Sequence, residues 1–580
     1  MNKRNNRDSF QGKDKASNYK SGSRKFDKRK KGSRVDDSEP EIRTKSGAAV
    51  RNMQSCADND PAWYSVNEQL LRDSASFPYS WPVGNKLTQV IQDGSTDRTT
   101  MQSVPGVLSL YLSPTVGWAD SSESPVNVAS RNIYSFVRHA NSGHANYDAP
   151  DLMLYLLAMD SCYSYHSFLR RLYGVMMDYT PINRYYPRAV VASMNVDFDD
   201  AIAHLAQLRY YINQFAVKLG SMCVPNSMSY MVRHMWMYSQ IFTDSMSAKA
   251  QTYIYNPHAF YKFSLVEDAG ALLYTTFANL GTGAGKRMTV EELINFGNEL
   301  MVPILQNEDM NIMSGDILKA YGAEGVIKIM GVSEDYQVLP VFSEEVMSQF
   351  QNATNVGYFN SDNVAHVNDI TQATGVGQGY LIHKPTVVRA IHGLSTTADL
   401  KRKTPWEFDR LISLRKQDVA PADTMVATRL TNIGENAKAI TSGTNVGYSS
   451  VELHTAGSEI CHSMVVFRYG NVGSGWDLLS SPFLFVGDEL LYADPAYDSD
   501  VNINQRNETV SRVLSSQMEH ELTIAMLSVF ERHPIMYPSS VQMSWDPTPT
   551  FTYDQSVVYF FDVDNYTTLS KHDLERMVET

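Results

Sequence analysis

The stretch from Asp148 to Pro187 constrains the fold of this chain more than any other part of the sequence. A helical stripe at i, i+3, i+4 spacing is formed by Leu152, Tyr155, Leu156, Met159 and Tyr163. Met153, Leu154 and Leu157 lie on the other side of the same helix. A helix that is apolar nearly all round is normally buried inside a large domain. The pattern therefore predicts a central structural helix and not a catalytic element.

The sequence also predicts where this helix begins and ends. Asp148 is suited to cap the helix, and Pro150 fits its first turn because proline needs no hydrogen bond there. Thr180 and Pro181 are expected to end it, because proline lacks the N–H that a continuing helix would donate. About thirty residues at ~1.5 Å each would span on the order of 45 Å.

Charge is distributed very unevenly along the chain. Residues 1–34 contain 13 Lys and Arg against 3 Asp, a net charge of +10; subtraction from the whole chain leaves residues 35–580 with 37 basic and 60 acidic residues, a net charge of −23. A segment this polar cannot bury enough surface to fold alone, so residues 1–55 are predicted to be a disordered basic arm and hinge that binds nucleic acid. Such arms bind phosphates without reading sequence.

The candidate RNA-binding residues are the cations of this arm. They are Lys3, Arg4, Arg7, Lys13, Lys15, Lys20, Arg24, Lys25, Lys28, Arg29, Lys30, Lys31 and Arg34. A solubilising or targeting tail is the alternative, because residues 28–31 alone resemble a nuclear localisation signal.

The rest of the chain is predicted to be mainly α, an α-rich α+β fold. Helices are expected at 197–220, at 226–255 and at 508–532, and capping boxes predict further helices beginning near Thr289, Thr404 and Ser570. Residues 85–147 are expected to be irregular because of their turn-forming dipeptides. Short β patterns occur at 379–383, 387–392, 463–469 and 557–562.

Four regions follow from this distribution. After the arm at 1–55, a helical domain is expected at 56–340, a smaller region containing β-strands at 341–505, and C-terminal helices that return to the helical domain at 506–580. No internal repeat of 20–50 residues is present, which argues against a solenoid. No apolar window approaches the roughly twenty residues that span a bilayer, so no membrane-spanning segment is expected.

Stretches that resemble motifs for catalysis or cofactor binding lack residues that those motifs require. Gly281–Arg287 resembles a phosphate-binding loop but lacks its first glycine and the Ser or Thr after its lysine. Cys461 and His462 would point to opposite faces of a strand. The four cysteines are far apart, and no export signal precedes them, so reduced thiols are expected. We therefore predict no catalytic residue, no metal site and no cofactor.

Several stretches resemble the capsid proteins of picobirnaviruses, small viruses with segmented double-stranded RNA genomes. The resemblance is carried by Asn59-Asp60-Pro61-Ala62-Trp63-Tyr64, Trp81-Pro82-Val83-Gly84, Asp151–Tyr155, Arg170–Gly174 and Asn183–Pro187. It covers most of residues 55–230 and is looser beyond them.

This resemblance implies a viral coat protein that forms homodimers and closes into a small icosahedral shell of T=1 type. It also implies that residues 56–340 and 506–580 form a helical shell domain and that residues 341–505 form a protruding region. It implies that the arm faces genomic double-stranded RNA, that the viral RNA polymerase is a further partner inside the shell, and that the virion is assembled in the host cytoplasm. Arm removal by maturation cleavage, including self-cleavage, would fall in the polar stretch 36–60.

Two other classes of function remain open at this point. A nucleoprotein that coats RNA without closing a shell would share the basic arm. An enzyme with an unrecognised site would show a pocket in which carboxylates or histidines of perturbed pKa converge.

Overall fold

The computed structural model describes a large part of the chain and divides it into two compact units, residues 1–78 and 79–580. The described residues are 42–43, 49–50, 67–69, 72–73, 86–92, 97–103, 106–141, 147–179, 185–245, 250–266, 269–277, 287–354, 368–373, 379–390, 412–416, 418–442, 445–472, 475–483, 530–533, 541–543 and 555–557. In the first unit, β1 (Ile42–Arg43) pairs antiparallel with β2 (Ala49–Val50).

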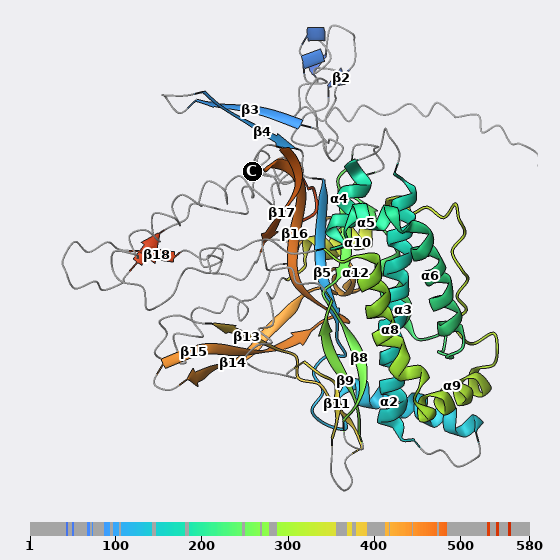
Figure 1. Ribbon diagram of the computed structural model, residues 1–580. Coiled ribbons are helices and arrows are strands. Elements are labelled where there is room, and N and C mark those ends of the chain that lie inside the picture. Colours follow the sequence, from blue (N-terminus) through green and yellow to red (C-terminus); the bar gives the residue numbers. More distant parts are fainter. Residues whose placement is uncertain are drawn as a thin grey trace, which may run out of the picture. The chain divides into compact units, whose positions relative to one another are not determined.

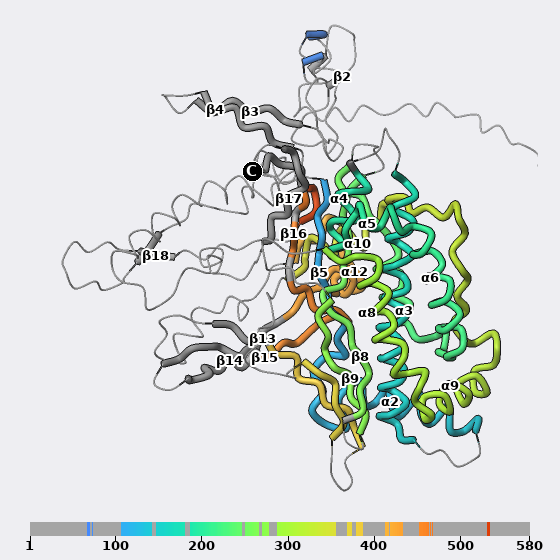
Figure 2. Tube along the Cα trace, in the orientation of Figure 1, coloured from blue at the N-terminus to red at the C-terminus, as the bar shows by residue number. Residues whose placement is uncertain are grey.

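The expected central helix is present as α3 (Ala149–Met177) and is buried over nearly its whole length. It begins one residue after Asp148, whose backbone N–H donates to the Asp151 carboxylate at 3.0 Å. Packed against α3 are α2, α6, α7, α8 and strand β8, so apolar neighbours surround it (Figures 1 and 2). The all-round apolar pattern is explained by this surrounding packing.

The other helices are short or of medium length. They are α2 (Pro125–Ala140), α4 (Tyr185–Ser193), α5 (Phe198–Ala203), α6 (Leu205–Gly220), α7 (Ser229–Ser239), α8 (Val290–Leu305), α9 (Glu308–Tyr321), α10 (Glu344–Gln351) and α12 (Pro421–Ala427). The predicted capping box at Thr289 is confirmed, because its hydroxyl accepts from the Glu292 N–H at 3.3 Å and its own N–H donates to the Glu292 carboxylate at 2.8 Å.

A six-stranded mixed sheet joins segments from both halves of the chain (Figure 1). Its order is β10 (Val341–Phe342), β6 (Phe242–Thr243), β7 (Thr252–Pro257), β5 (Val107–Pro114), β16 (Glu459–Val472) and β17 (Gly475–Phe483). In its centre β5 runs parallel to β7 and antiparallel to β16, with Leu108 opposite Val466. All eight residues of β5 are buried, as expected of a central strand.

Smaller sheets complete the described structure. The antiparallel pairs are β3 (Lys86–Gln92) with β4 (Asp97–Ser103), β8 (Ala259–Val266) with β9 (Ala269–Thr276), β11 (Thr371–Gln372) with β12 (Leu381–Ile382), and β18 (Val541–Met543) with β19 (Gln555–Val557). A three-stranded sheet has the order β13 (Thr386–Ala390), β15 (Asn445–Thr455) and β14 (Asn432–Ser442). The strand patterns at 379–383, 387–392 and 463–469 are confirmed by β12, β13 and β16.

The structure corrects three predictions. Residues 85–147 are not irregular but contain β3, β4, β5 and α2. The helix expected at 226–255 ends at Ser239 and gives way to β6 and β7. The helix expected at 197–220 is interrupted at His204 and forms α5 and α6. The described fold is therefore mixed α/β, which agrees with the α+β part of the prediction, and it contains more strand than expected before residue 260.

Other predicted elements lie outside the described residues. These are the helices beginning near Thr404 and Ser570, all but the last three residues of the helix at 508–532, and all but the first residue of the strand at 557–562.

Candidate functional site

The thirteen cations predicted to bind RNA, from Lys3 to Arg34, all lie outside the described residues. The glycine-rich loop at 281–286 lies outside them as well. The described part of the chain instead contains two features that sequence reasoning did not find: a buried charged network and an apolar depression on its surface.

The buried network joins α3, α7 and β16 through Asp160, His234 and Glu459. His234 Nδ1 lies 2.8 Å from Asp160 Oδ2, and His234 Nε2 lies 3.3 Å from Glu459 Oε1. The three side chains are only 0–2% exposed. Two carboxylates therefore hold one imidazole between them in the protein interior.

Arg233 extends this network toward the surface. Its Nε donates to Glu459 Oε1 at 2.6 Å, and Ser458 Oγ donates to the same oxygen at 2.6 Å. The Arg233 guanidinium also lies 3.5 Å from the Glu345 carboxylate and donates to the amide oxygen of Gln349 at 3.1 Å, both on α10. Four elements that are distant in sequence are thus held by one set of charges.

The charges of the network shift the pKa values of its members. Burial disfavours a charged imidazole, but the Asp160 and Glu459 carboxylates outweigh burial and raise the pKa of His234 to about 9. Burial also disfavours a charged Glu459, yet His234 and Arg233 lower the pKa of its carboxyl to about 2. Burial raises the pKa of Asp160, and its ion pair with His234 opposes that rise.

This network is suited to hold elements together and not to perform catalysis. A catalytic carboxylate or imidazole must reach a substrate, but these side chains are enclosed. Within the described residues, the depression detailed below is lined by other side chains, and no group of three His, Cys, Asp or Glu could hold a metal ion. Removing one partner of such a buried pair leaves an uncompensated charge in the interior. The network therefore stabilises the packing of α3, α7 and α10 on β16.

A second buried cation ties α3 to the sheet. Arg171 is fully buried; its Nη1 donates to the Tyr255 carbonyl at 2.7 Å, and its Nη2 donates to Asn256 Oδ1 at 2.7 Å. Burial lowers the pKa of this guanidinium to about 9. Because both acceptors belong to β7, the central helix is fixed in position against the strand beside β5.

The sequence gives one indication that α3 makes buried charged contacts. Asp160 and Arg171 are charged residues in the middle of a helix whose pattern predicts burial on nearly every side, and a buried charge requires a partner. That rule predicts that partners exist, but it does not say which residues they are.

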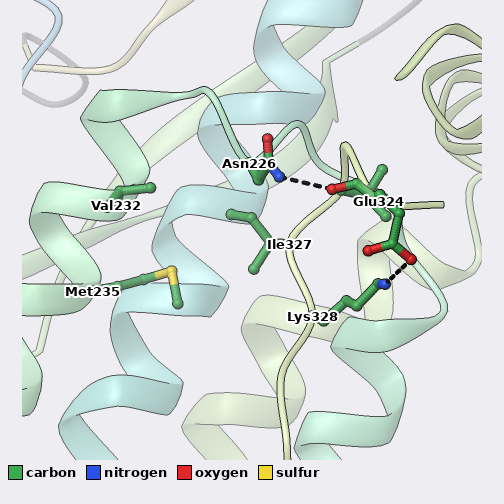
Figure 3. Close-up of a pocket in the computed structure, with 7 residues that line it drawn as sticks. Asn226, Val232, Met235, Glu324, Ile327 and Lys328 are labelled. Atoms are coloured by element: carbon green, nitrogen blue, oxygen red, sulfur yellow. Dashed lines mark hydrogen bonds and ion pairs between the residues drawn. The ribbon is translucent and has the colours of Figure 1, made fainter. Parts of the chain in front are cut away.

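An open apolar depression of about 370 Å³ lies between α7 and the segment that follows α9. Figure 3 shows Val232 and Met235 on one side and Ile327 on the other. At its rim, Asn226 Nδ2 donates to the Glu324 carbonyl at 2.9 Å, and Lys328 pairs with the Glu324 carboxylate at 2.8 Å. Because Val232, Met235, Val326 and Ile327 supply its apolar lining and the polar groups at its rim pair with one another, this depression suits an apolar protein surface better than a polar small molecule.

Comparison with known proteins decides the family. The family model of the picobirnavirus capsid protein matches residues 63–546. The chain belongs to the picobirnavirus capsid protein family. The predicted resemblance, which rested on motifs between residues 59 and 187, is confirmed by a match over most of the chain.

A curated relative and a solved structure agree with this assignment. The capsid protein precursor of a human picobirnavirus (strain Human/Thailand/Hy005102/-) is 35% identical over 309 residues, which are 52% of this capsid-family chain. The match spans 55% of the relative's own length. The X-ray crystallographic structure of the picobirnavirus capsid is similar in fold, with a TM-score of 0.64 at 21% identity over 83% of this chain and 90% of that one. Among the described residues, no helix is both long and apolar enough to cross a membrane.

Proposed function

We propose that this chain is the shell-forming coat protein of a virion. In this proposal it forms dimers that close into a small icosahedral shell of T=1 type around double-stranded RNA. The match of the capsid family model to residues 63–546 carries the proposal. A viral shell of this kind is a structural assembly, and the enclosed charged network supports that role over an enzymatic one.

The charge asymmetry supports the role of the arm. Residues 1–34 carry +10 while the remainder carries −23, so polyanion binding is concentrated on the arm cations from Lys3 to Arg34. Contacts to phosphates alone are loose and sensitive to salt, which would leave packaged RNA mobile. The viral RNA polymerase inside the shell, assembly in the host cytoplasm and cleavage of the arm within 36–60 belong to the same proposal.

The proposed domain division keeps the boundaries 56–340, 341–505 and 506–580. One structural fact refines it: β16, from the middle region, is hydrogen bonded to β5, from the first. We therefore place the root of the protruding region at β16 and its outer part at β13, β14 and β15.

Electron microscopy of the purified protein tests shell formation, and closed particles of uniform diameter are expected. Nuclease digestion at a salt concentration that weakens arm–RNA contacts separates the shell from an open nucleoprotein, because only a closed shell protects RNA under those conditions. Monomers under every salt and pH condition would refute the shell.

Deletion of residues 1–34 tests the arm. The truncated protein is expected to fold and assemble but to contain little RNA, as measured by the ratio of absorbance at the nucleic-acid and protein maxima. A matched control replaces the thirteen cations with Gln at full arm length. RNA content equal to that of the unmodified protein in both variants would refute RNA binding by these residues.

A further inference from the structure

Three buried histidines lie close together where the three-stranded sheet of β13, β15 and β14 joins the rest of the fold. His258 lies between β7 and β8, His383 between β12 and β13, and His462 in β16. They are only 0–4% exposed. Because they come from three distant parts of the sequence, the folded chain alone brings them together. We call these three residues the histidine cluster.

The end of β5 holds the histidine cluster in position. His462 Nε2 lies 2.6 Å from Ser113 Oγ, and His383 Nε2 lies 3.1 Å from Thr115 Oγ1. Ser113 and Thr115 are two residues apart, the spacing at which side chains of an extended segment share a face. The third ring, that of His258, stacks on His462 with 4.2 Å between the ring centroids. β5 therefore positions two imidazoles through hydroxyl side chains and the third through His462.

The histidine cluster also lies on the connections that lead into the three-stranded sheet. The His383 N–H donates to the Ala119 carbonyl at 2.8 Å, and the Ala119 N–H donates to the His383 carbonyl at 2.7 Å. β13 begins three residues after His383, and the Leu453 N–H of β15 donates to the Pro385 carbonyl at 2.9 Å. β15 in turn is joined by a short loop to β16, which carries His462. A change at the cluster therefore acts directly on the attachment of this sheet.

Burial favours the neutral form of these imidazoles. It lowers the pKa of His258 to about 4, from an ordinary value of about 6.5. It also lowers the pKa of His383 to about 4, although the Asp369 carbonyl, 3.4 Å from His383 Nδ1, opposes the shift. A proton on His258 would in addition place a charge beside the stacked ring of His462. The cluster is therefore packed for uncharged histidines at neutral pH.

The tyrosines that face the cluster carry no charge that could offset a proton. Tyr261 of β8 lies edge-on to His383 with 6.1 Å between the ring centroids, and Tyr274 Oη of β9 lies 3.3 Å from His462 Nε2. From α7, the Tyr230 hydroxyl donates to a backbone carbonyl at the end of β5. Burial raises the pKa of all three phenols well above the ordinary value, so they remain neutral.

The charged side chains near the cluster are engaged with other groups. The Asp369 carboxylate accepts from a backbone N–H of β9 at 2.6 Å, and Glu459 of β16 belongs to the buried network described above. The Lys384 ammonium lies 5.8 Å from the centroid of the Trp118 ring, and His454 of β15 stacks on the same ring with 5.3 Å between centroids. Protonation of the buried cluster therefore weakens this packing.

We propose that the histidine cluster is a pH switch at the base of the three-stranded sheet: when its imidazoles become charged, the sheet separates from the end of β5 while the core around α3 stays folded. This inference rests on the proposed protruding region and adds the condition under which that region moves. The core differs because His234, at its centre, has a pKa raised to about 9 and is already charged at neutral pH. In a virion, the switch makes the protruding region responsive to an acidic environment.

The direction of the pH effect follows from the lowered pKa values. The closed cluster binds fewer protons than an open one, so the closed state is fully favoured above about pH 6.5 and loses stability as the pH falls toward 4. Each of His258 and His383 multiplies the ratio of open to closed chains by up to about tenfold per pH unit in that window. Together they imply an increase on the order of 100-fold between pH 7 and pH 5.

Hydrogen–deuterium exchange of the full-length chain tests the switch, with each rate divided by the intrinsic exchange rate at the same pH. Between pH 7 and pH 5, protection at residues 383–386 and 451–455 is expected to fall by about 100-fold. Protection at residues 155–170 of α3 should change by less than about threefold. Unchanged protection at 383–386, or an equal loss in α3, would overturn the proposal.

Two single substitutions assign the effect to the cluster. His258→Gln and His383→Gln each remove one titrating group and keep a polar side chain, so each should reduce the loss of protection by about tenfold. His166→Gln is the matched control: His166 is also buried, with a pKa lowered to about 3, but it lies on α3 against Phe215. The control should leave the loss at residues 383–386 unchanged. An undiminished loss in both cluster variants would overturn the proposal.

Folding of each variant is verified by protection of residues 155–170 at pH 7. If a variant does not fold, the comparison of pH 7 with pH 5 in the unmodified chain decides the proposal alone, because it needs no substitution.

The outcomes separate this inference from the proposed function. If the unmodified chain forms closed particles while protection at 383–386 is the same at pH 7 and pH 5, the shell stands and the switch is wrong. If protection at 383–386 falls as expected and micrographs contain no particles, the switch stands and the shell falls.

Discussion

His234 Nδ1 lies 2.8 Å from Asp160 Oδ2 in the interior, where α7 crosses α3. On its other side the same imidazole faces Glu459, the first residue of β16. One histidine thereby connects the central helix α3 to the mixed sheet.

We predict that His234→Gln destabilises the folded chain by about 3–5 kcal/mol, because it leaves the buried Asp160 carboxylate without its cation and leaves Glu459 with Arg233 alone. Denaturant unfolding followed by circular dichroism measures the change. Asp199→Asn is the control: Asp199 pairs with Arg188 at 2.8 Å on the surface, where such pairs contribute about 0–1 kcal/mol. Equal losses in both variants would contradict the role of the buried network.

The same network predicts a dependence of stability on pH. The pKa of His234 is raised to about 9, so its contribution is complete below its unfolded value of about 6.5 and is lost as the pH rises through 9. The pKa of Glu459 is lowered to about 2, so its contribution is present above about 4.5 and is lost as the pH falls through 2.

The free energy of unfolding should therefore fall from pH 6.5 to pH 9. Its slope should reach up to about 1.4 kcal/mol per pH unit for the one proton held by His234. Titration of the unfolding free energy between pH 5 and pH 9.5 measures that slope. It should be reduced in His234→Gln, and an identical slope in variant and unmodified chain would assign the effect to other groups.

A glycine on α8 offers a packing test. A Cβ at Gly297 would come within 2.7 Å of Tyr165 Cε1 on α3 and would also collide with the Tyr211 hydroxyl on α6. We expect Gly297→Ala to lower the melting temperature, with a cost of about 1–3 kcal/mol for overpacking. Gly315→Ala on α9 is the matched control, because no atom lies within 4 Å of its added Cβ. That control should gain about 0.5–1 kcal/mol from helix propensity. The same sign of change in both would contradict the close packing of α8 on α3.

The central helix can be tested at its middle. Leu156 is fully buried in α3, so Leu156→Asp places an unpaired charge in the core and should prevent soluble folding. Soluble yield and thermal melting measure this outcome. Met425→Asp, at an exposed site on α12, should express and melt like the unmodified chain. Normal melting of Leu156→Asp would contradict the burial of α3.

Local patterns predicted those parts of the fold that local chemistry determines. The start of α3 followed from Asp148 and Pro150, and the start of α8 followed from Thr289 and Glu292. The end of α7 was missed because its Met-rich pattern was extended into 252–255, where alternating Thr, Tyr and Ile favour a strand instead. The strand β5 was missed because turn-forming pairs on either side outweighed its own apolar residues.

The buried network could not be predicted from the same patterns. Asp160, His234 and Glu459 lie on three elements that only the folded chain brings together, and none has a helical or strand spacing to the others. The buried face of the region from Ala201 to Leu219 could be predicted, because its apolar residues repeat at 4-3-4-3-4 spacing.

The pairing of β5 with β16 has a consequence for biosynthesis. β5 ends at residue 114, but its antiparallel partner begins at residue 459. At about 5–20 residues per second, a ribosome needs on the order of 20–70 s to translate the intervening stretch. Throughout that interval one long edge of β5 has no native neighbour on the nascent chain. Contacts of such high sequence separation form slowly, so newly made chains require protection from one another before the sheet can close.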